Sequence, residues 1–280
     1  MAHPLIASLG SVPLLMGIVN TTPDSFSDGG DCLTPTMAIA RARELVAGGA
    51  HIVDIGGEST GPGSTTVPAS IEWQRIEPAI AALTPETFIS VDTYRASTAN
   101  KALARGARMI NDVSAMRADP EMASVVKDHD AYVVLMFSKE TASHPHATRA
   151  APSYSDVIAA IGDFLARRID FSLAQGISTD RIVLDPGMGA FLSGDPEPSW
   201  TVLEQLSRLR ERFSDFPLLV GTSRKSFLGG SVHERDPLSQ LTGLIAALHG
   251  AAILRTHRVG MLQQFLSAWS RTNPGKSAAR

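Results

Sequence analysis

Carboxylate and amide side chains recur in this chain at the points where apolar runs end. Asp185 follows one such run and opens the turn Asp185-Pro186-Gly187-Met188-Gly189. The same ending recurs at Asp54, Asp92 and Asn111. A buried strand that delivers a carboxylate and then turns sharply is how a parallel α/β sheet presents chemistry at its edge. Four such endings indicate that the same arrangement of a strand followed by a turn repeats along the chain.

Other apolar runs end in an amide or in cationic groups. Asn20 follows the first run, Lys225 the seventh, and Arg255 and His257 the eighth. A floor of carboxylates and amides suits a ligand rich in N–H donors, such as a fused nitrogen heterocycle with an amino-pyrimidinone edge. Arg255 and His257 suit phosphate. Asn20 can offer a neutral oxygen to Mg²⁺.

Some of these polar residues also have a purely structural explanation. We expect Asp54 to order its own loop by accepting from backbone N–H groups, and Asp112 to serve as a turn or capping residue. Arg255 taken alone could form a surface ion pair. His144 and His146 lie in a loop without metal-ligand spacing, so we expect no metal role for them. Joint placement at successive strand ends favours a functional role for the main group.

Eight apolar runs alternate with eight helical segments, which predicts a (β/α)8 TIM barrel in a single α/β domain. A doubly wound open sheet is the alternative, but no Gly-x-Gly-x-x-Gly follows the first run. We expect a leader over 1–13, the barrel over 14–271 and a polar tail over 272–280. The expected strands cover 14–19, 51–55, 88–91, 109–110, 132–136, 181–184, 218–221 and 252–254. The expected helices cover 34–48, 68–83, 95–105, 120–128, 155–175, 198–213, 238–249 and 260–269.

Composition narrows the class of protein. Apolar residues make up 44% of the 280 residues and charged residues 19%, which suits a folded core rather than disorder. The net charge of −3, without a basic stripe, argues against nucleic acid as a partner. No apolar run reaches the roughly 18 residues that a membrane span needs. Cys32 is the only cysteine, and we expect a soluble cytoplasmic protein.

In its ordered set of motifs the sequence resembles the dihydropteroate synthases, a family of the folate pathway. The matching stretches span nearly the whole chain in family order: 16–30, 54–60, 90–93, 111–114, 184–187, 223–226 and 255–257. The resemblance implies a transferase that condenses 6-hydroxymethyl-7,8-dihydropterin diphosphate with 4-aminobenzoate, with help from Mg²⁺. It also implies a homodimer formed through helices near the end of the chain.

The resemblance assigns roles to individual residues. Asn20, Asp92, Lys225, Arg255 and His257 would be the catalytic group, with Asn20 also meeting the metal. The pterin would be held by Asp92, Asn111, Asp185 and Lys225, with Met136 packing near it. The diphosphate would be held by Asn20, Thr60, Arg255 and His257. The aminobenzoate would meet Ser226 at a helix start, together with Asp24, Ser25 and Phe26.

The chain departs from the family pattern at three places. Gly61 stands where most members have Arg, Phe137 replaces a usual His, and Ala190-Phe191-Leu192 replaces Phe-Gly-Lys. The last segment resembles the sulfonamide-insensitive members, so poor sulfonamide binding is our hypothesis. Two other functions stay open: a pterin-dependent methyltransferase-like domain and a non-catalytic pterin-binding paralogue, which the absence of Arg at Gly61 favours.

Overall fold

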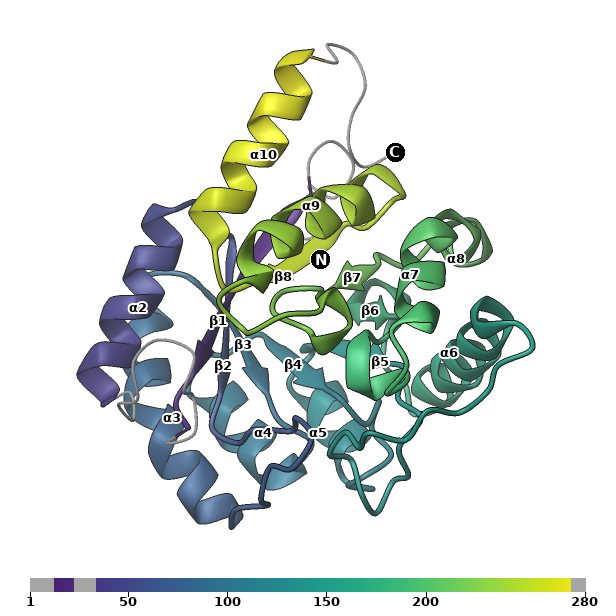
Figure 1. The fold of residues 1–280 in the computed structure, drawn as a ribbon. Helices are drawn as coiled ribbons and strands as arrows, with labels where there is room; N and C mark the ends of the chain where they lie inside the picture. The colour runs from purple at the N-terminus through teal and green to yellow at the C-terminus, as the bar shows by residue number, and fades with distance from the viewer. Residues whose placement is uncertain (1–12, 23–33, 273–280) are drawn as a thin grey trace.

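Eight parallel strands form a nearly closed barrel in the computed structural model, which describes residues 13–22 and 34–272 (Figure 1). The strands pair in the order β6-β5-β4-β3-β2-β1-β8-β7, and an isolated bridge between Leu184 and Leu218 joins the two ends. The predicted (β/α)8 barrel is therefore confirmed. The strands are β1 Leu14–Asn20, β2 Ile52–Gly56, β3 Phe88–Asp92, β4 Met109–Asp112, β5 Tyr132–Met136, β6 Ile182–Asp185, β7 Leu219–Val220 and β8 Ile253–Thr256.

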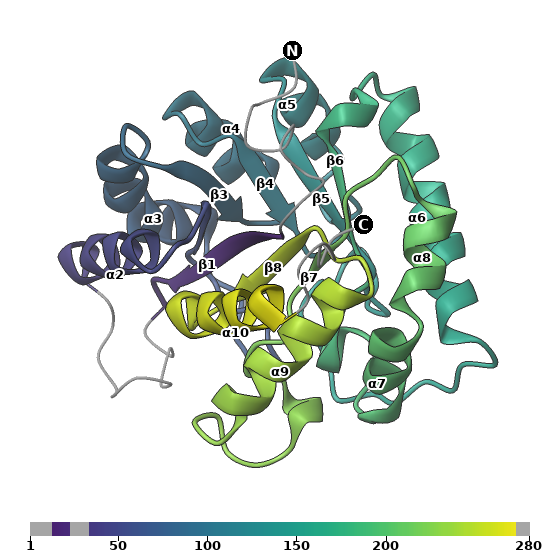
Figure 2. The same ribbon diagram turned by 90° about the horizontal axis from the view of Figure 1, so that it is seen from above.

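The helices of the described residues surround the barrel on its outside (Figure 2). Local signals start some of them: Thr34 accepts a hydrogen bond from the Met37 amide at α2, and Asp156 accepts one from Ala159 at α6. None of these helices is long and apolar enough to cross a membrane. The helices are α2 Pro35–Ala47, α3 Ala69–Leu83, α4 Ala96–Ala104, α5 Met122–Asp128, α6 Val157–Ala174, α7 Glu197–Glu204, α8 Leu206–Arg212, α9 Arg235–Leu248 and α10 Val259–Thr272.

One expected helix is two. The segment 198–213 divides into α7 and α8 at Gln205, whose backbone leaves helical geometry at φ −109° and ψ 17°. The ring of His249 donates to the Leu203 carbonyl over 2.6 Å. That carbonyl is among the last of α7, and His249 satisfies it from outside the helix. The contact comes from 46 residues away, so local periodicity did not predict the break.

Two apolar layers hold the barrel together. The inner layer fills the barrel with one or two side chains from each strand: Leu14, Met16, Ile52, Phe88, Met109, Tyr132, Val134, Val183, Leu219 and Ile253. The outer layer packs the opposite faces of the strands against the helices. Because successive side chains of a strand point to opposite faces, each strand serves both layers.

Candidate active site

The alternation that fills the barrel also builds a cavity at the carboxyl ends of its strands. On β1, Leu14 and Met16 belong to the inner core, and the next two residues of the same face, Ile18 and Asn20, line the cavity. On β3, the same alternation carries Asp92 into the cavity. The strands of the sheet therefore position the side chains at the floor of the cavity.

Nine predicted site residues meet in this cavity of about 490 Å³: Asn20, Thr60, Asp92, Asn111, Met136, Asp185, Lys225, Arg255 and His257. Ser226 is not among them. It is exposed and lines an adjoining cavity, also of about 490 Å³, that shares Gly61, Phe191, Arg224 and Lys225 with the first. The expected helix start at Ser226 is a single 3₁₀ turn. The last three predicted residues, Asp24, Ser25 and Phe26, lie outside the described residues.

Arg255 ties two of the acids together at the floor. Its Nε donates to Asp54 Oδ2 over 2.7 Å, and its Nη2 donates to Asp92 Oδ2 over 2.8 Å. Asp54 is fully buried, and Arg255 is largely covered. The interpretation of Arg255 as a surface ion pair is therefore wrong. The cationic side of the cavity is also not separate from its acidic side, because Arg255 belongs to both.

Asp54 on β2 and Asp112 at the end of β4 have different structural roles. The expectation that Asp54 orders its own loop is wrong, because it faces the barrel interior and accepts from Arg255 and from Asn111 Nδ2, over 3.0 Å. Asp112 is the turn residue expected. Its Oδ1 accepts from the Ser114 amide over 2.7 Å, and its Oδ2 accepts from the Met116 amide in the turn that follows.

Burial shifts the ionisation of the groups that face the cavity. Burial raises the pKa of Asp185 to about 6, although the Gly187 amide donates to its carboxylate over 2.7 Å. Burial, reinforced by Arg255, lowers the pKa of Lys225 to about 8. Burial also raises the pKa of Asp92 above its ordinary value, against the attraction of Arg255. Opposed shifts of neighbouring acids and bases are typical of functional sites.

Ser223 orients the ring of His257. The backbone amide of His257 donates to Ser223 Oγ over 3.1 Å, and ring Nδ1 lies 2.9 Å from the same oxygen. Burial, followed by the charges of Arg224 and Arg255, lowers the pKa of His257 well below its usual value, so the ring is neutral. When Ser223 donates to Nδ1, the proton of the ring is on Nε2, which can then donate to a ligand.

A strained turn delivers Lys225. Arg224 adopts a left-handed backbone with φ 60°, which is costly for a residue other than glycine. Several contacts hold it, among them a hydrogen bond from its Nε to Asp236 over 2.8 Å and one from its amide to Ser239 Oγ over 2.9 Å. The ammonium of Lys225 then lies 5.0 Å from the centre of the Phe191 ring, a cation–π distance.

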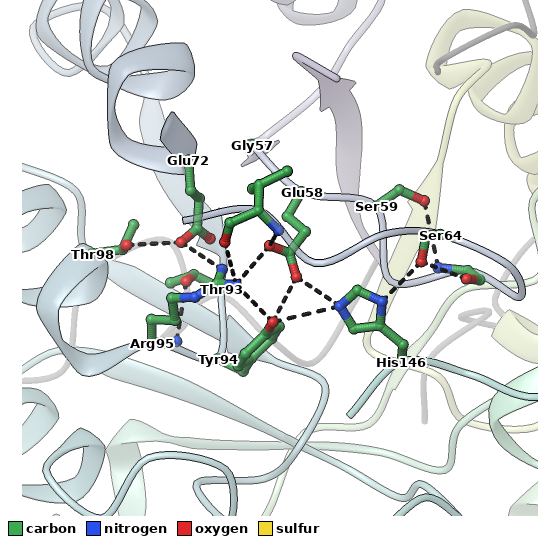
Figure 3. Close-up of polar contacts among 12 residues, drawn as sticks. Gly57, Glu58, Ser59, Ser64, Glu72, Thr93, Tyr94, Arg95, Thr98 and His146 are labelled. Atoms are coloured by element: carbon green, nitrogen blue, oxygen red, sulfur yellow. Dashed lines mark hydrogen bonds and ion pairs between the residues drawn. The ribbon is translucent and has the colours of Figure 1, made fainter. Parts of the chain in front are cut away.

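Glu58, which was not predicted as a site residue, lines the cavity near Thr60. Its buried carboxylate joins three loops of the rim, as Figure 3 shows. Oε1 accepts from Tyr94 and His146, each over 2.6 Å, and Oε2 accepts from Arg95 over 2.7 Å. Glu58 belongs to the matched stretch 54–60, but its partners come from distant loops, so no local pattern indicated this role.

Several known proteins with a similar sequence and the same fold are dihydropteroate synthases. Residues 16–257 match the family of pterin-binding enzymes. A dihydropteroate synthase of Synechocystis is 40% identical over 91% of this chain and 88% of its own length. The structure of a Xanthomonas albilineans dihydropteroate synthase with 4-aminobenzoic acid is 38% identical, with a TM-score of 0.85 over 95% of this chain and 94% of that one.

A Yersinia pestis dihydropteroate synthase, solved in a sulfonamide drug complex, is 32% identical with a TM-score of 0.86 over 96% of each chain. The match covers the barrel, the strand ends and the cavity together, at a level of identity well above that of a shared fold alone. The chain belongs to the family of pterin-binding enzymes, and within it to the dihydropteroate synthases.

Proposed function

We propose that this enzyme condenses 6-hydroxymethyl-7,8-dihydropterin diphosphate with 4-aminobenzoate to give 7,8-dihydropteroate and diphosphate. The observation that carries the proposal is the meeting of Asp92, Asn111, Asp185 and Lys225 in one cavity. Relatives have been solved with 4-aminobenzoic acid and with 7,8-dihydropteroate. In the reaction the carbon–oxygen bond to diphosphate breaks, the aniline nitrogen bonds to that carbon, and the nitrogen loses a proton.

The floor of the cavity would recognise the pterin. Asp185 and Asp92 can accept from ring and exocyclic N–H groups, Asn111 can donate and accept, and Lys225 can donate to a ring oxygen or nitrogen. Met136 is buried at the same end and offers an apolar surface to the ring. A buried polar group left without its partner costs about 1–3 kcal/mol, so this floor would reject rings with a different donor pattern.

Asn20, Thr60, Arg255 and His257 would hold the diphosphate. The Asn20 side chain fits a Mg²⁺ ion bound mainly through substrate, because one neutral oxygen is a suitable ligand where phosphate oxygens and waters supply the others. Among the described residues, no group of three or more His, Cys, Asp or Glu is arranged to hold a metal by itself. When bound, Mg²⁺ would stabilise the charge of the departing diphosphate. Arg255 and His257 would add a cation and a neutral donor.

The adjoining cavity would receive 4-aminobenzoate. Ser226 and Lys225 line it together with Gly61, so a ring placed there can approach the first cavity through the residues that the two share. Our expectation that Asp24, Ser25 and Phe26 complete this pocket stays a prediction. No protein nucleophile is required, because the aniline nitrogen attacks the carbon that diphosphate leaves.

The proposal includes weak inhibition by sulfonamides. Its support is the segment Ala190-Phe191-Leu192, which resembles that of insensitive members, and the position of Phe191 in the wall of both cavities. A ring packed there, against Lys225, can restrict bulk in the cavity proposed for 4-aminobenzoate. Inhibition constants measured beside a susceptible synthase test the idea, and equal potency on both enzymes would refute it.

The proposal also includes a homodimer in the cytoplasm. Five exposed large apolar side chains lie on the neighbouring helices α9 and α10: Leu238, Leu241, Leu248, Met261 and Phe265. A second copy of the chain would cover this face. The cytoplasmic location stays a prediction, and fractionation of the producing cells checks it.

Product formation from the two substrates tests the reaction itself. We expect 7,8-dihydropteroate to form with Mg²⁺ and to fall by more than about tenfold when the metal is chelated. Pterin binding without product would favour the non-catalytic paralogue. Transfer of a methyl group to a corrinoid would favour the methyltransferase-like function.

A further inference from the structure

The segment between β5 and α6 reaches back to the loop after β2 and holds it at the rim of the cavity (Figure 3). The ring of His146 lies between two oxygen atoms of that loop: Nε2 is 2.6 Å from Glu58 Oε1, and Nδ1 is 3.0 Å from Ser64 Oγ. The next residue, Ala147, donates its amide to the Thr60 carbonyl over 2.8 Å. We call the contacts of His146 with Glu58 and Ser64 the His146 clasp.

The clasp acts on the part of the loop that lines the cavity. Ser64 Oγ also donates to the Gly61 carbonyl over 2.6 Å, so the ring of His146 is joined through one hydroxyl to the backbone beside Thr60. Thr60 and Gly61 both line the cavity, whereas His146 does not. The position of Thr60 is therefore fixed on one side by Glu58 and on the other by Ser64, with His146 bridging the two.

Glu58 is suited to anchor such a bridge. Its side chain is 2% exposed, and its carboxylate accepts from Tyr94, His146, Arg95 and the Val67 amide. Although burial acts to raise the pKa of Glu58, these donors outweigh burial and hold that pKa below its ordinary value. The anchor is thus a carboxylate, which accepts strongly from a ring N–H.

We propose that His146 is a positioning residue: through the clasp it holds Thr60 and Gly61 where the diphosphate end of the first substrate binds. Gly61 has no side chain to contribute there, and an added Cβ would meet only Ser59 Oγ, at 3.7 Å. Gly61 is bonded within its own loop to Ser59 and Ser64, and the His146 clasp adds a hold on this backbone from a second loop. The inference rests on the proposed location of the diphosphate.

Two ligands separate this role from general stability. We would measure binding to the full chain, with Mg²⁺, of 6-hydroxymethyl-7,8-dihydropterin diphosphate and of the same pterin without diphosphate. His146→Ala should weaken the first about tenfold and the second less than about twofold, because only the first uses Thr60. His146→Gln should restore part of the loss, since its side-chain amide can donate to Glu58. His144→Ala is the matched control, because this exposed ring contacts Ser143 in the same segment.

Hydrogen exchange gives a second readout that does not depend on the ligand. In His146→Ala, amides of the peptide over residues 57–67 should exchange faster, while those of α6 stay unchanged. Equal weakening of both ligands, no rescue by Gln, or unchanged exchange over 57–67 would each overturn the proposal. A different outcome is that the wild-type enzyme binds both pterins with equal affinity while amides over 57–67 exchange faster in the variant. The proposed location of the diphosphate would then be wrong, and so would this role of His146.

Discussion

Burial gives single residues of the cavity unusual ionisation. Asp185 is 6% exposed, and its pKa is raised to about 6, while the pKa of Lys225 is lowered to about 8. Between these two values both groups carry charge in the free enzyme. Under the proposed function, the ionised carboxylate would accept from a pterin N–H, and the ammonium would donate. Substrate recognition and ionisation would then be coupled at the same atoms.

The pH dependence of kcat/KM follows from these two shifts. As pH falls through about 6, Asp185 gains a proton and loses its value as an acceptor. Asp92, whose pKa is also raised by burial, contributes to the same acid limb, so kcat/KM should fall. As pH rises through about 8, Lys225 loses its charge, and kcat/KM should fall again. The profile should therefore be bell-shaped. The matched comparison is the pH profile of Asp185→Asn, which removes the titration of Asp185 and keeps that of the substrate. An acid limb as steep in this variant as in the wild type would contradict the assignment of that limb to Asp185.

The carboxylate of Asp185 should lower the stability of the folded protein at neutral pH. A raised pKa in the folded state means that folding disfavours the ionised form, so the contribution of Asp185 is most favourable below pH 4 and is lost as pH rises through about 6. Asp185→Asn should therefore raise the free energy of unfolding by roughly 1–3 kcal/mol at pH 7.5 and by much less at pH 4.5. Chemical denaturation at the two pH values measures this, and a gain that is larger at pH 4.5 would contradict the sign.

The sequence predicted which polar residues lie at the strand ends, but it did not predict the hydrogen-bond partners of their side chains. Asp92, Asn111, Asp185 and Lys225 meet in one cavity as the alternation of a parallel barrel requires. Asp54 was misread because its partner Arg255 lies 201 residues away. Glu58 was missed for the same reason. Local pattern gives the face on which a side chain lies, whereas its bonds depend on which strands and loops become neighbours.

Among the elements, the turn after β6 is tightly constrained by its neighbours. Gly187 has φ +69°, and a Cβ there would lie 2.2 Å from the carbonyl oxygen of Phe137. Gly187→Ala should destabilise the fold by about 3–5 kcal/mol, from backbone strain and overpacking together. Gly63→Ala is the control: φ is +83°, but nothing lies within 4 Å of the added Cβ. It should cost about 1–2 kcal/mol.

Thermal or chemical unfolding of the two glycine variants decides the point. Similar losses in both would show that backbone conformation alone sets the cost, and that contact between the β5 and β6 turns does not. The strands and most helices were predictable within a few residues because periodicity is a local property. The division of 198–213 at Gln205 was not, because His249 supplies the outside donor.

At the scale of the whole molecule, the barrel has a face that it does not cover itself. Leu241 on α9 is 45% exposed and is one of five exposed large apolar side chains on α9 and α10. If this face forms a homodimer, Leu241→Glu should convert the dimer to a monomer, because a charge would be buried without a partner. Leu173→Glu on α6, at 42% exposure, is the matched control and should leave the dimer intact. Sedimentation velocity reports both, and a dimer in both variants would contradict this face.

Under the proposed function, the reaction takes place at the carboxyl ends of the strands and nowhere else on the barrel. The rate of 7,8-dihydropteroate formation in Asp92→Asn, compared with Asp130→Asn, tests this location. Asp130 precedes β5 at the opposite end, where it pairs with Arg181 over 2.7 Å and is largely exposed. We predict a fall of at least about 100-fold for Asp92→Asn, which weakens the floor and its bond to Arg255, and a change within about twofold for Asp130→Asn. A wild-type rate in Asp92→Asn, or equal losses in both variants, would contradict the account.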